Sequence, residues 1–189
     1  KHAFTENIQI NLGLLKRRLK SKDLKAKSIV LGRKTKTMIE IIYFDDICEE
    51  ELVTHIETEL KKVDVDGILD SGNIAEYLSE ENNTHFPTAI KTERPDTASK
   101  ALLEGKVLIF VDTSPFALIV PGFFSDFLNP VSDNYKKSNN INFLKILRFC
   151  CFFSTILAPA IYIALINYNP ETIPTSLLIN FSTQRDNVA

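Results

Sequence analysis

The feature that most limits what this chain can fold into is an uncharged run of eighteen residues in its C-terminal part. Residues 149–166 read FCCFFSTILAPAIYIALI. A bilayer core about 30 Å thick requires roughly 20 mostly apolar helical residues, and the apolar residues just before the run extend it to that length. Lys145 and Arg148 lie at its entrance, and Tyr162 and Tyr168 lie toward its exit, as expected at membrane interfaces. The run predicts a transmembrane helix, with a buried core helix of a larger α/β domain as the alternative.

Charge is distributed unevenly along the 189 residues, although the formal net charge is only −2. Residues 1–36 contain eleven Lys and Arg against Glu6 and Asp23, whereas residues 37–80 contain thirteen Asp and Glu against two lysines. The two segments are expected to attract each other or to face different partners. No aromatic residue is interleaved with the basic cluster at 16–22, so nucleic acid is not expected as a partner.

The first residues and the cysteines indicate the cellular setting. The N-terminal segment is basic and amphipathic, without an uninterrupted apolar stretch, so no signal peptide is expected. A chain that opens on lysine rather than methionine is expected to be a fragment. The three cysteines are Cys48 and the vicinal pair Cys150 and Cys151, which cannot easily bridge to itself. We expect free thiols in a reducing compartment and no disulfide framework.

Hydrophobic periodicity and turn residues predict a small α/β domain. Apolar residues at three- and four-residue steps predict helices at 6–20 and 49–63. Pro95 and Gly105 bracket a further helix with a proline start and a glycine cap. Shorter helices are expected at 74–79 and 123–128. β-rich runs predict a hairpin of 27–32 with 37–44, a short strand at 89–92, and a buried pair at 106–111 and 116–120. The predicted fold class is therefore α/β, with a small mixed sheet and flanking helices, followed by the hydrophobic helix.

Three polar loops that follow predicted strands form the candidate ligand site. Loops at strand ends, beside helix N-termini, are where α/β sheets bind small ligands, and an arginine there can grip a carboxylate with two nitrogens. The candidate residues are Asp70, Ser71, Glu93, Arg94, Asp96, Asp112 and Ser114. The alternative is structural. In that case Arg94 forms an ion pair with Asp70 or Asp112, and the other residues are caps and turns.

Motifs for catalysis and metal binding are missing from the sequence. It contains no GxGxxG, GxxxxGK[ST] or GxSxG pattern. The three histidines are far apart, and none has a second ligand at helical or hairpin spacing. Asp64, Asp66 and Asp70 alternate as in a calcium loop, but the twelfth position lacks the required glutamate. We therefore expect no enzyme activity, no catalytic residue, no metal and no cofactor.

Short motifs occur in a fixed order along almost the whole chain. They are FTEN at 4–7, LLKRRL at 14–19, GRKTKT at 32–37, DGILDSG at 66–72, TERPD at 92–96, DTSPF at 112–116, APAIYIAL at 158–165 and ETIPT at 171–175. This series resembles the GerA family of bacterial spore germination receptor A subunits. Two positions depart from the family pattern: Thr113 stands where glycine is usual, and Lys106 where arginine is common. Thr113 makes a left-handed turn at that position less favourable.

The resemblance implies a domain organisation. Residues 1–133 correspond to the second N-terminal subdomain of such subunits, a soluble α/β subdomain. Residues 134–142 form a polar linker, and residues 143–168 form the first hydrophobic helix. Residues 169–189 form an amphipathic tail that leads to further membrane helices.

The resemblance also implies a function, that of a nutrient germinant receptor in the inner membrane of a dormant spore. Its implied partners are B and C subunits and further A subunits in a channel-forming homo-oligomer. Nutrients such as amino acids, sugars or nucleosides would trigger release of ions and dipicolinate. Lys136, Lys137, Lys145 and Arg148 precede the hydrophobic helix and Glu171 alone closely follows it, which places the soluble domain on the cytoplasmic, spore-core side. The competing hypothesis is a membrane-tethered small-ligand-binding module, resembling a solute-binding protein, that uses the candidate loop residues.

Overall fold

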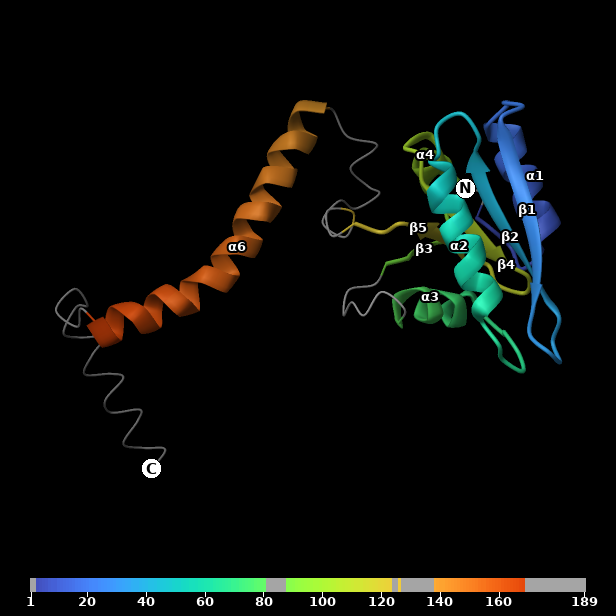
Figure 1. Ribbon diagram of the computed structural model, residues 1–189. Helices are drawn as coiled ribbons and strands as arrows, with labels where there is room; N and C mark the ends of the chain where they lie inside the picture. The colour runs from blue at the N-terminus through green and yellow to red at the C-terminus, as the bar shows by residue number, and fades with distance from the viewer. Residues whose placement is uncertain (1–2, 81–87, 124–125, 127–137, 169–189) are drawn as a thin grey trace. The chain divides into compact units, whose positions relative to one another are not determined.

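The computed structural model describes residues 3–80, 88–123, 126 and 138–168 (Figure 1). The chain forms two compact units, Lys1–Phe127 and Leu128–Ala189. The helix expected at 123–128 lies largely outside the described residues, and the tail at 169–189 lies wholly outside them.

A five-stranded sheet forms the centre of the first unit, in the order β1-β2-β4-β5-β3. Its strands are β1 Leu24–Leu31, β2 Thr37–Phe44, β3 Ile90–Thr92, β4 Val107–Val111 and β5 Ala117–Val120. The predicted α/β class is confirmed, but the predicted mixture of strand directions is not seen, because every described pairing is antiparallel. Short turns join β1 to β2 and β4 to β5, and such turns connect only antiparallel neighbours.

The predicted hairpin and the predicted buried strand pair are both present. In the hairpin, Leu24 is opposite Phe44 and Leu31 is opposite Thr37. Strand β4 lies between β2 and β5, and all five of its residues are buried. Its continuously apolar sequence is explained by helices that cover both faces of the sheet.

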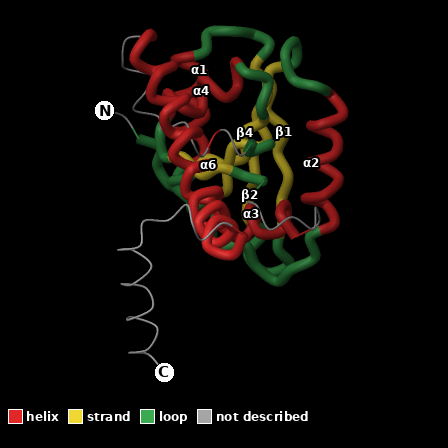
Figure 2. Tube along the Cα trace, turned by 90° about the vertical axis from the view of Figure 1, so that its left-hand side faces the viewer, coloured by secondary structure: helices red, strands yellow, loops and turns green. Residues whose placement is uncertain are grey.

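Two pairs of helices cover opposite faces of the sheet (Figure 2). They are α1 Ile8–Arg18 with α4 Pro95–Leu103, and α2 Glu50–Lys62 with α3 Ser71–Glu80. Neighbouring strand residues alternate between the two cores. Ile41 and Ile109 pack with α2 and α3, while Ile42 and Phe110 pack with α1 and α4. This alternation follows from the two-residue period of a strand.

Three local features refine the expected boundaries. Helix α3 begins at Ser71 rather than Ile74, because the Asp70 carboxylate accepts the N–H of Gly72 and caps the helix. Gly105 has a φ of 81°, which confirms it as the left-handed residue after α4. The expectation for Thr113 is wrong, since its φ is 73°. Its N–H donates to the Glu6 carbonyl at 3.0 Å, a contact that holds this residue in the left-handed region.

The second unit contains one long helix, α6 Ser138–Tyr168, with Pro159 inside it. It starts within the range expected to be the polar linker. Residues Phe143–Leu165 have a mean hydropathy of 1.9, and none of the apolar window is buried inside the structure. By length and composition this segment is able to cross a membrane, and it is not the buried core helix of the alternative interpretation.

Candidate functional site

Asp70, Ser71 and Ser114 come together where the start of α3 meets the turn after β4. Ser114 Oγ donates to Asp70 Oδ1 at 2.6 Å and lies 3.1 Å from Ser71 Oγ. The Gly72 N–H donates to Asp70 Oδ2 at 3.0 Å, and both serines are buried. The contacts join the start of α3 to the central part of the sheet.

The pKa of Asp70 lies below its ordinary value, chiefly because of the hydrogen bond from Ser114. Partial burial opposes this shift, whereas the backbone N–H groups of Gly72 and Ser71 and the charge of Lys91 support it. The protein itself therefore supplies the donors and the positive charge that stabilise this carboxylate. A ligand-binding role for these three residues stays a prediction.

Replacing Ser114 with alanine is expected to lower the free energy of unfolding of the first unit by about 1.5–3 kcal/mol at pH 7, since a hydrogen bond to a charged group is lost. The pKa of Asp70 is lower in the folded than in the unfolded protein. The contribution of Asp70 to the free energy of unfolding is therefore fully present above the unfolded pKa of about 3.9, and it is lost as the pH falls through the folded pKa. The difference in unfolding free energy between the variant and the parent protein should therefore become smaller as the pH falls below about 3.9. Urea unfolding at several pH values measures it.

Ser99→Ala is the matched control for this prediction. The Ser99 hydroxyl is also buried, but it donates to a neutral acceptor, the Pro95 carbonyl, at 2.6 Å. Loss of this hydrogen bond should lower the free energy of unfolding by about 1 kcal/mol at every pH. Equal pH dependence in the two variants would contradict the assigned role of Asp70.

The remaining predicted site residues do not join this cluster through any described contact. Arg94 forms a two-point ion pair with Asp96, with Nε–Oδ1 and Nη2–Oδ2 distances of 3.1 and 2.7 Å. The described partner of Arg94 is thus Asp96, whereas the structural alternative had expected Asp70 or Asp112. Glu93 accepts the Phe4 N–H through its backbone carbonyl, and the Asp112 N–H donates to the Met38 carbonyl.

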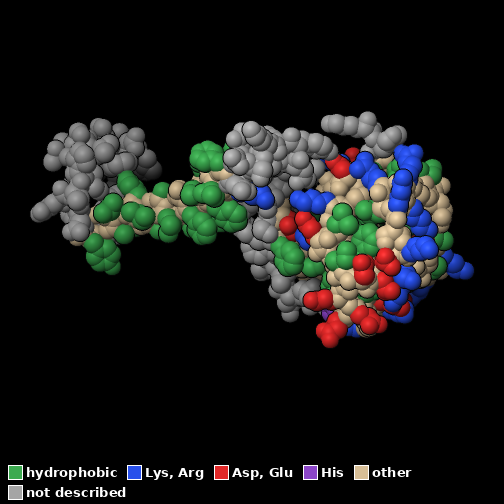
Figure 3. Space-filling model, turned by 90° about the horizontal axis from the view of Figure 1, so that it is seen from above, with side chains coloured by type: hydrophobic (Ala, Val, Ile, Leu, Met, Phe, Trp, Pro, Cys, Tyr) green, Lys and Arg blue, Asp and Glu red, His purple; other side chains and the backbone are tan. Residues whose placement is uncertain are grey.

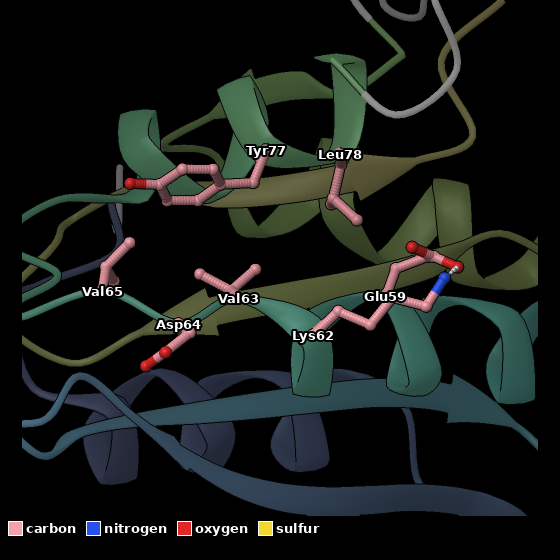
Figure 4. Close-up of a pocket in the computed structure, with 7 residues that line it drawn as sticks. All are labelled: Glu59, Lys62, Val63, Asp64, Val65, Tyr77 and Leu78. Carbon is pink, nitrogen blue, oxygen red and sulfur yellow. Dashed lines mark hydrogen bonds and ion pairs between the residues drawn. The ribbon is translucent and has the colours of Figure 1, made fainter.

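A cavity of about 480 Å³ lies between α2 and α3 and was not predicted from the sequence. Figure 4 shows its lining, with Glu59 and Lys62 on α2 and Tyr77 and Leu78 on α3. The lining residues are Glu59, Lys62, Val63, Asp64, Val65, Tyr77 and Leu78. The cavity therefore combines an apolar wall with charged groups, as small-molecule sites do.

Glu59 is the unusual residue of this cavity, because its side chain is only 10% exposed. Its Oε1 accepts the Lys62 ammonium at 2.8 Å, and His55 Nδ1 lies 3.8 Å from the same oxygen. Its Oε2 is buried and has no hydrogen-bond partner among the residues that the structure describes. Asp64, by contrast, is exposed and paired with Arg33 through both carboxylate oxygens. The one sequence signal for Glu59 is its position three residues after the inward Ile56 on α2.

Among the residues that the structure describes, no group of three or more His, Cys, Asp or Glu side chains is placed to hold a metal ion.

Comparison with known proteins identifies the family. The model of the Bacillus/Clostridium GerA spore germination protein matches residues 1–189. The chain belongs to the GerA family. Spore germination protein KA of Bacillus subtilis (strain 168) is 38% identical to this GerA-family chain over 186 residues, covering 98% of the chain and 34% of that protein. Spore germination protein B1 of the same strain is 34% identical over 188 residues, covering 100% of the chain and 39% of that protein.

A solved structure agrees with the fold of the first unit. The crystal structure of the N-terminal domain of the A subunit of the Bacillus megaterium spore germinant receptor GerK3 is 43% identical, with a TM-score of 0.53. The match covers 65% of the GerA-family chain and 98% of that domain. The chain thus spans little more than a third of the length of the two curated relatives, and includes almost all of a domain that crystallises in a related receptor.

Proposed function

We propose that this chain is part of a non-enzymatic A subunit of a nutrient germinant receptor, anchored in the spore inner membrane by α6. The observation that carries the proposal is the combination of two features in one GerA-family chain. One is an α/β unit with two cores, and the other is an apolar helix whose apolar window is not buried in the structure. A helix of this composition is stable in water only if something covers it, and a bilayer is a suitable environment.

The proposed orientation places the first unit on the cytoplasmic, spore-core side. Lys136, Lys137, Lys145 and Arg148 precede the apolar segment, and Glu171 alone closely follows it. Basic residues are retained on the cytoplasmic side during insertion, which supports this orientation. The proposed organisation is a soluble unit at 1–133, a linker that ends at the start of α6, the membrane helix, and a tail that continues into the membrane region.

The proposed partners are B and C receptor subunits and further A subunits in a homo-oligomer. In this arrangement the first unit senses or transmits a nutrient signal, and the complex triggers germination with release of ions and dipicolinate. Crosslinking of the full-length subunit in membranes tests the proposal. Crosslinks between A subunits and to the B subunit are expected, whereas a strictly monomeric subunit without partners would contradict it.

A second candidate function is a membrane-tethered module that binds a small ligand, and the cavity between α2 and α3 favours it. Several of the loop residues predicted for this role are engaged with one another, Asp70 with Ser114 and Arg94 with Asp96. The Glu59 carboxylate, in contrast, has a buried oxygen without a hydrogen-bond partner in the described part of the chain, and it lies beside a cavity of about 480 Å³. A ligand with a hydrogen-bond donor can satisfy that oxygen after a small adjustment of the cavity wall.

Calorimetric titration of the chain in detergent with amino acids, glucose and a nucleoside tests this second function. Glu59→Gln should weaken the binding of any nutrient that contacts the cavity by about tenfold, since it removes a charged acceptor. Glu57→Gln is the control, because Glu57 lies on the same helix but pairs with Lys27 and Lys61 outside the cavity. Absence of binding at millimolar nutrient would reject the ligand-binding module and leave the receptor proposal intact.

A further inference from the structure

Six exposed basic side chains lie close together in the sequence, at the end of α1 and the start of the edge strand β1, and the fold does not neutralise them. The six are Lys16, Arg17, Arg18, Lys20, Lys22 and Lys25, which together are called the basic face here. All six are exposed, and within the described part of the chain none of them forms an ion pair. The one acidic residue in this stretch, Asp23, accepts a hydrogen bond from Ser21 Oγ at 2.7 Å.

Most basic residues elsewhere in the first unit form ion pairs. Eight of them each have a carboxylate partner, namely Lys27, Arg33, Lys34, Lys61, Lys62, Arg94, Lys100 and Lys106. Of the other basic residues that the structure describes in this unit, only Lys36 and Lys91 also lack an ion pair, so six of the eight unpaired cations belong to the basic face. Figure 3 shows Lys and Arg side chains gathered along the side of the unit where α1 and β1 lie, while Asp and Glu gather elsewhere.

Helix electrostatics explain only part of this concentration. Lys16, Arg17 and Arg18 occupy the last turn of α1, where the helix dipole favours positive charge. Lys20, Lys22 and Lys25 lie beyond the helix and gain nothing from the dipole, which acts within the last turn. Repulsion among six neighbouring cations is a cost to folding that a bound anionic surface would remove.

We propose that the basic face docks on the anionic lipid surface of the membrane that anchors the chain. The inference rests on the proposed membrane anchoring by α6. The first unit and α6 belong to one chain, so anchoring by α6 would tether the first unit to the same bilayer. Exposed Lys and Arg are attracted to anionic headgroups within a Debye length of the surface. The absence of aromatic residues among 16–25 argues against a nucleic acid as the anionic partner.

The test uses the whole chain reconstituted in nanodiscs of phosphatidylcholine alone or enriched in phosphatidylglycerol. Acetylation rates of individual lysines are followed by mass spectrometry. Lys16, Lys20, Lys22 and Lys25 should react several-fold more slowly in the anionic discs, and about 1 M NaCl should restore their rates, because it shortens the Debye length to about 3 Å. Lys34 is exposed on the β1–β2 turn and serves as the internal control, with an unchanged rate.

A charge-neutralised variant sharpens the test. Arg17→Gln, Arg18→Gln and Lys22→Gln together should reduce surface attraction by about a hundredfold, at about fivefold per charge, and abolish protection of the three remaining lysines. All three positions are exposed, so the variant should fold.

Equal acetylation rates of the basic-face lysines in the two kinds of disc would overturn the proposal. Slow acetylation in neutral discs as well would also overturn it, because it would indicate protection by protein contacts. A chain that fails to enter discs at all would overturn the membrane anchor, and the docking with it. A chain that enters discs but shows no protection would overturn the docking alone.

Discussion

Replacing Phe110 with alanine is expected to lower the free energy of unfolding of the first unit by about 3–5 kcal/mol. Phe110 is fully buried in the central strand β4. Its ring packs edge-on against Phe4, with ring centroids 4.9 Å apart and an interplanar angle of 82°. The substitution leaves a cavity in the core beneath α1 and α4, and it removes the aromatic contact that holds the N-terminal segment. Urea or guanidinium unfolding followed by circular dichroism measures the effect.

The control for this variant is Leu103→Ala. Leu103 is the last residue of α4 and is 57% exposed, so its truncation should change the unfolding free energy by less than about 1 kcal/mol. A similar loss of stability in both variants would contradict the core assigned to this face of the sheet.

The second large effect is expected in α6, where Ile156→Asp should prevent stable membrane insertion of the 189-residue chain. Ile156 lies near the middle of Phe143–Leu165 and is 56% exposed. A charged aspartate at the centre of a transmembrane helix costs about 2.5–3.5 kcal/mol, and an apolar contribution is lost as well. The alkali-resistant membrane fraction should therefore fall by about a hundredfold relative to the extractable fraction.

Ile10→Asp is the matched control for insertion. Ile10 is also an isoleucine in a helix and is 53% exposed, but it lies on α1 of the first unit. An aspartate in the first turn of α1 is favourable with the helix dipole, so membrane association should be unchanged. If the Ile156→Asp chain still resists alkaline extraction, α6 is not the element that holds this chain in the membrane.

Local signals in the sequence were sufficient to predict most elements of the fold. Pro95 and Gly105 act within a single helical turn, so they correctly bracketed α4. The two β-rich runs on either side of a turn correctly predicted the hairpin of β1 and β2. The uniformly apolar β4 was correctly recognised as covered on both faces, because a half-exposed strand would alternate.

The site could be predicted only in part, because its geometry depends on contacts between distant segments. Asp70 and Ser114 were selected from separate loops, and the structure joins them directly. The left-handed Thr113 was missed because a backbone contact with the distant Glu6 outweighs its own conformational preference. Glu59 was missed because a glutamate on an acidic helix is usually solvated, and its burial depends on how α2 packs beside α3.

The central claim is that a membrane-spanning α6 holds the α/β unit on the cytoplasmic side. Single-cysteine labelling in the full-length protein tests this claim most directly. With the native cysteines replaced, Leu69→Cys reports on the first unit, where Leu69 is 75% exposed, and Ile156→Cys reports on α6. A membrane-impermeant maleimide should label Leu69→Cys in inside-out vesicles but not in right-side-out vesicles. Ile156→Cys should be protected in both. Labelling of Ile156→Cys in either vesicle type, or of Leu69→Cys in right-side-out vesicles, would contradict the account.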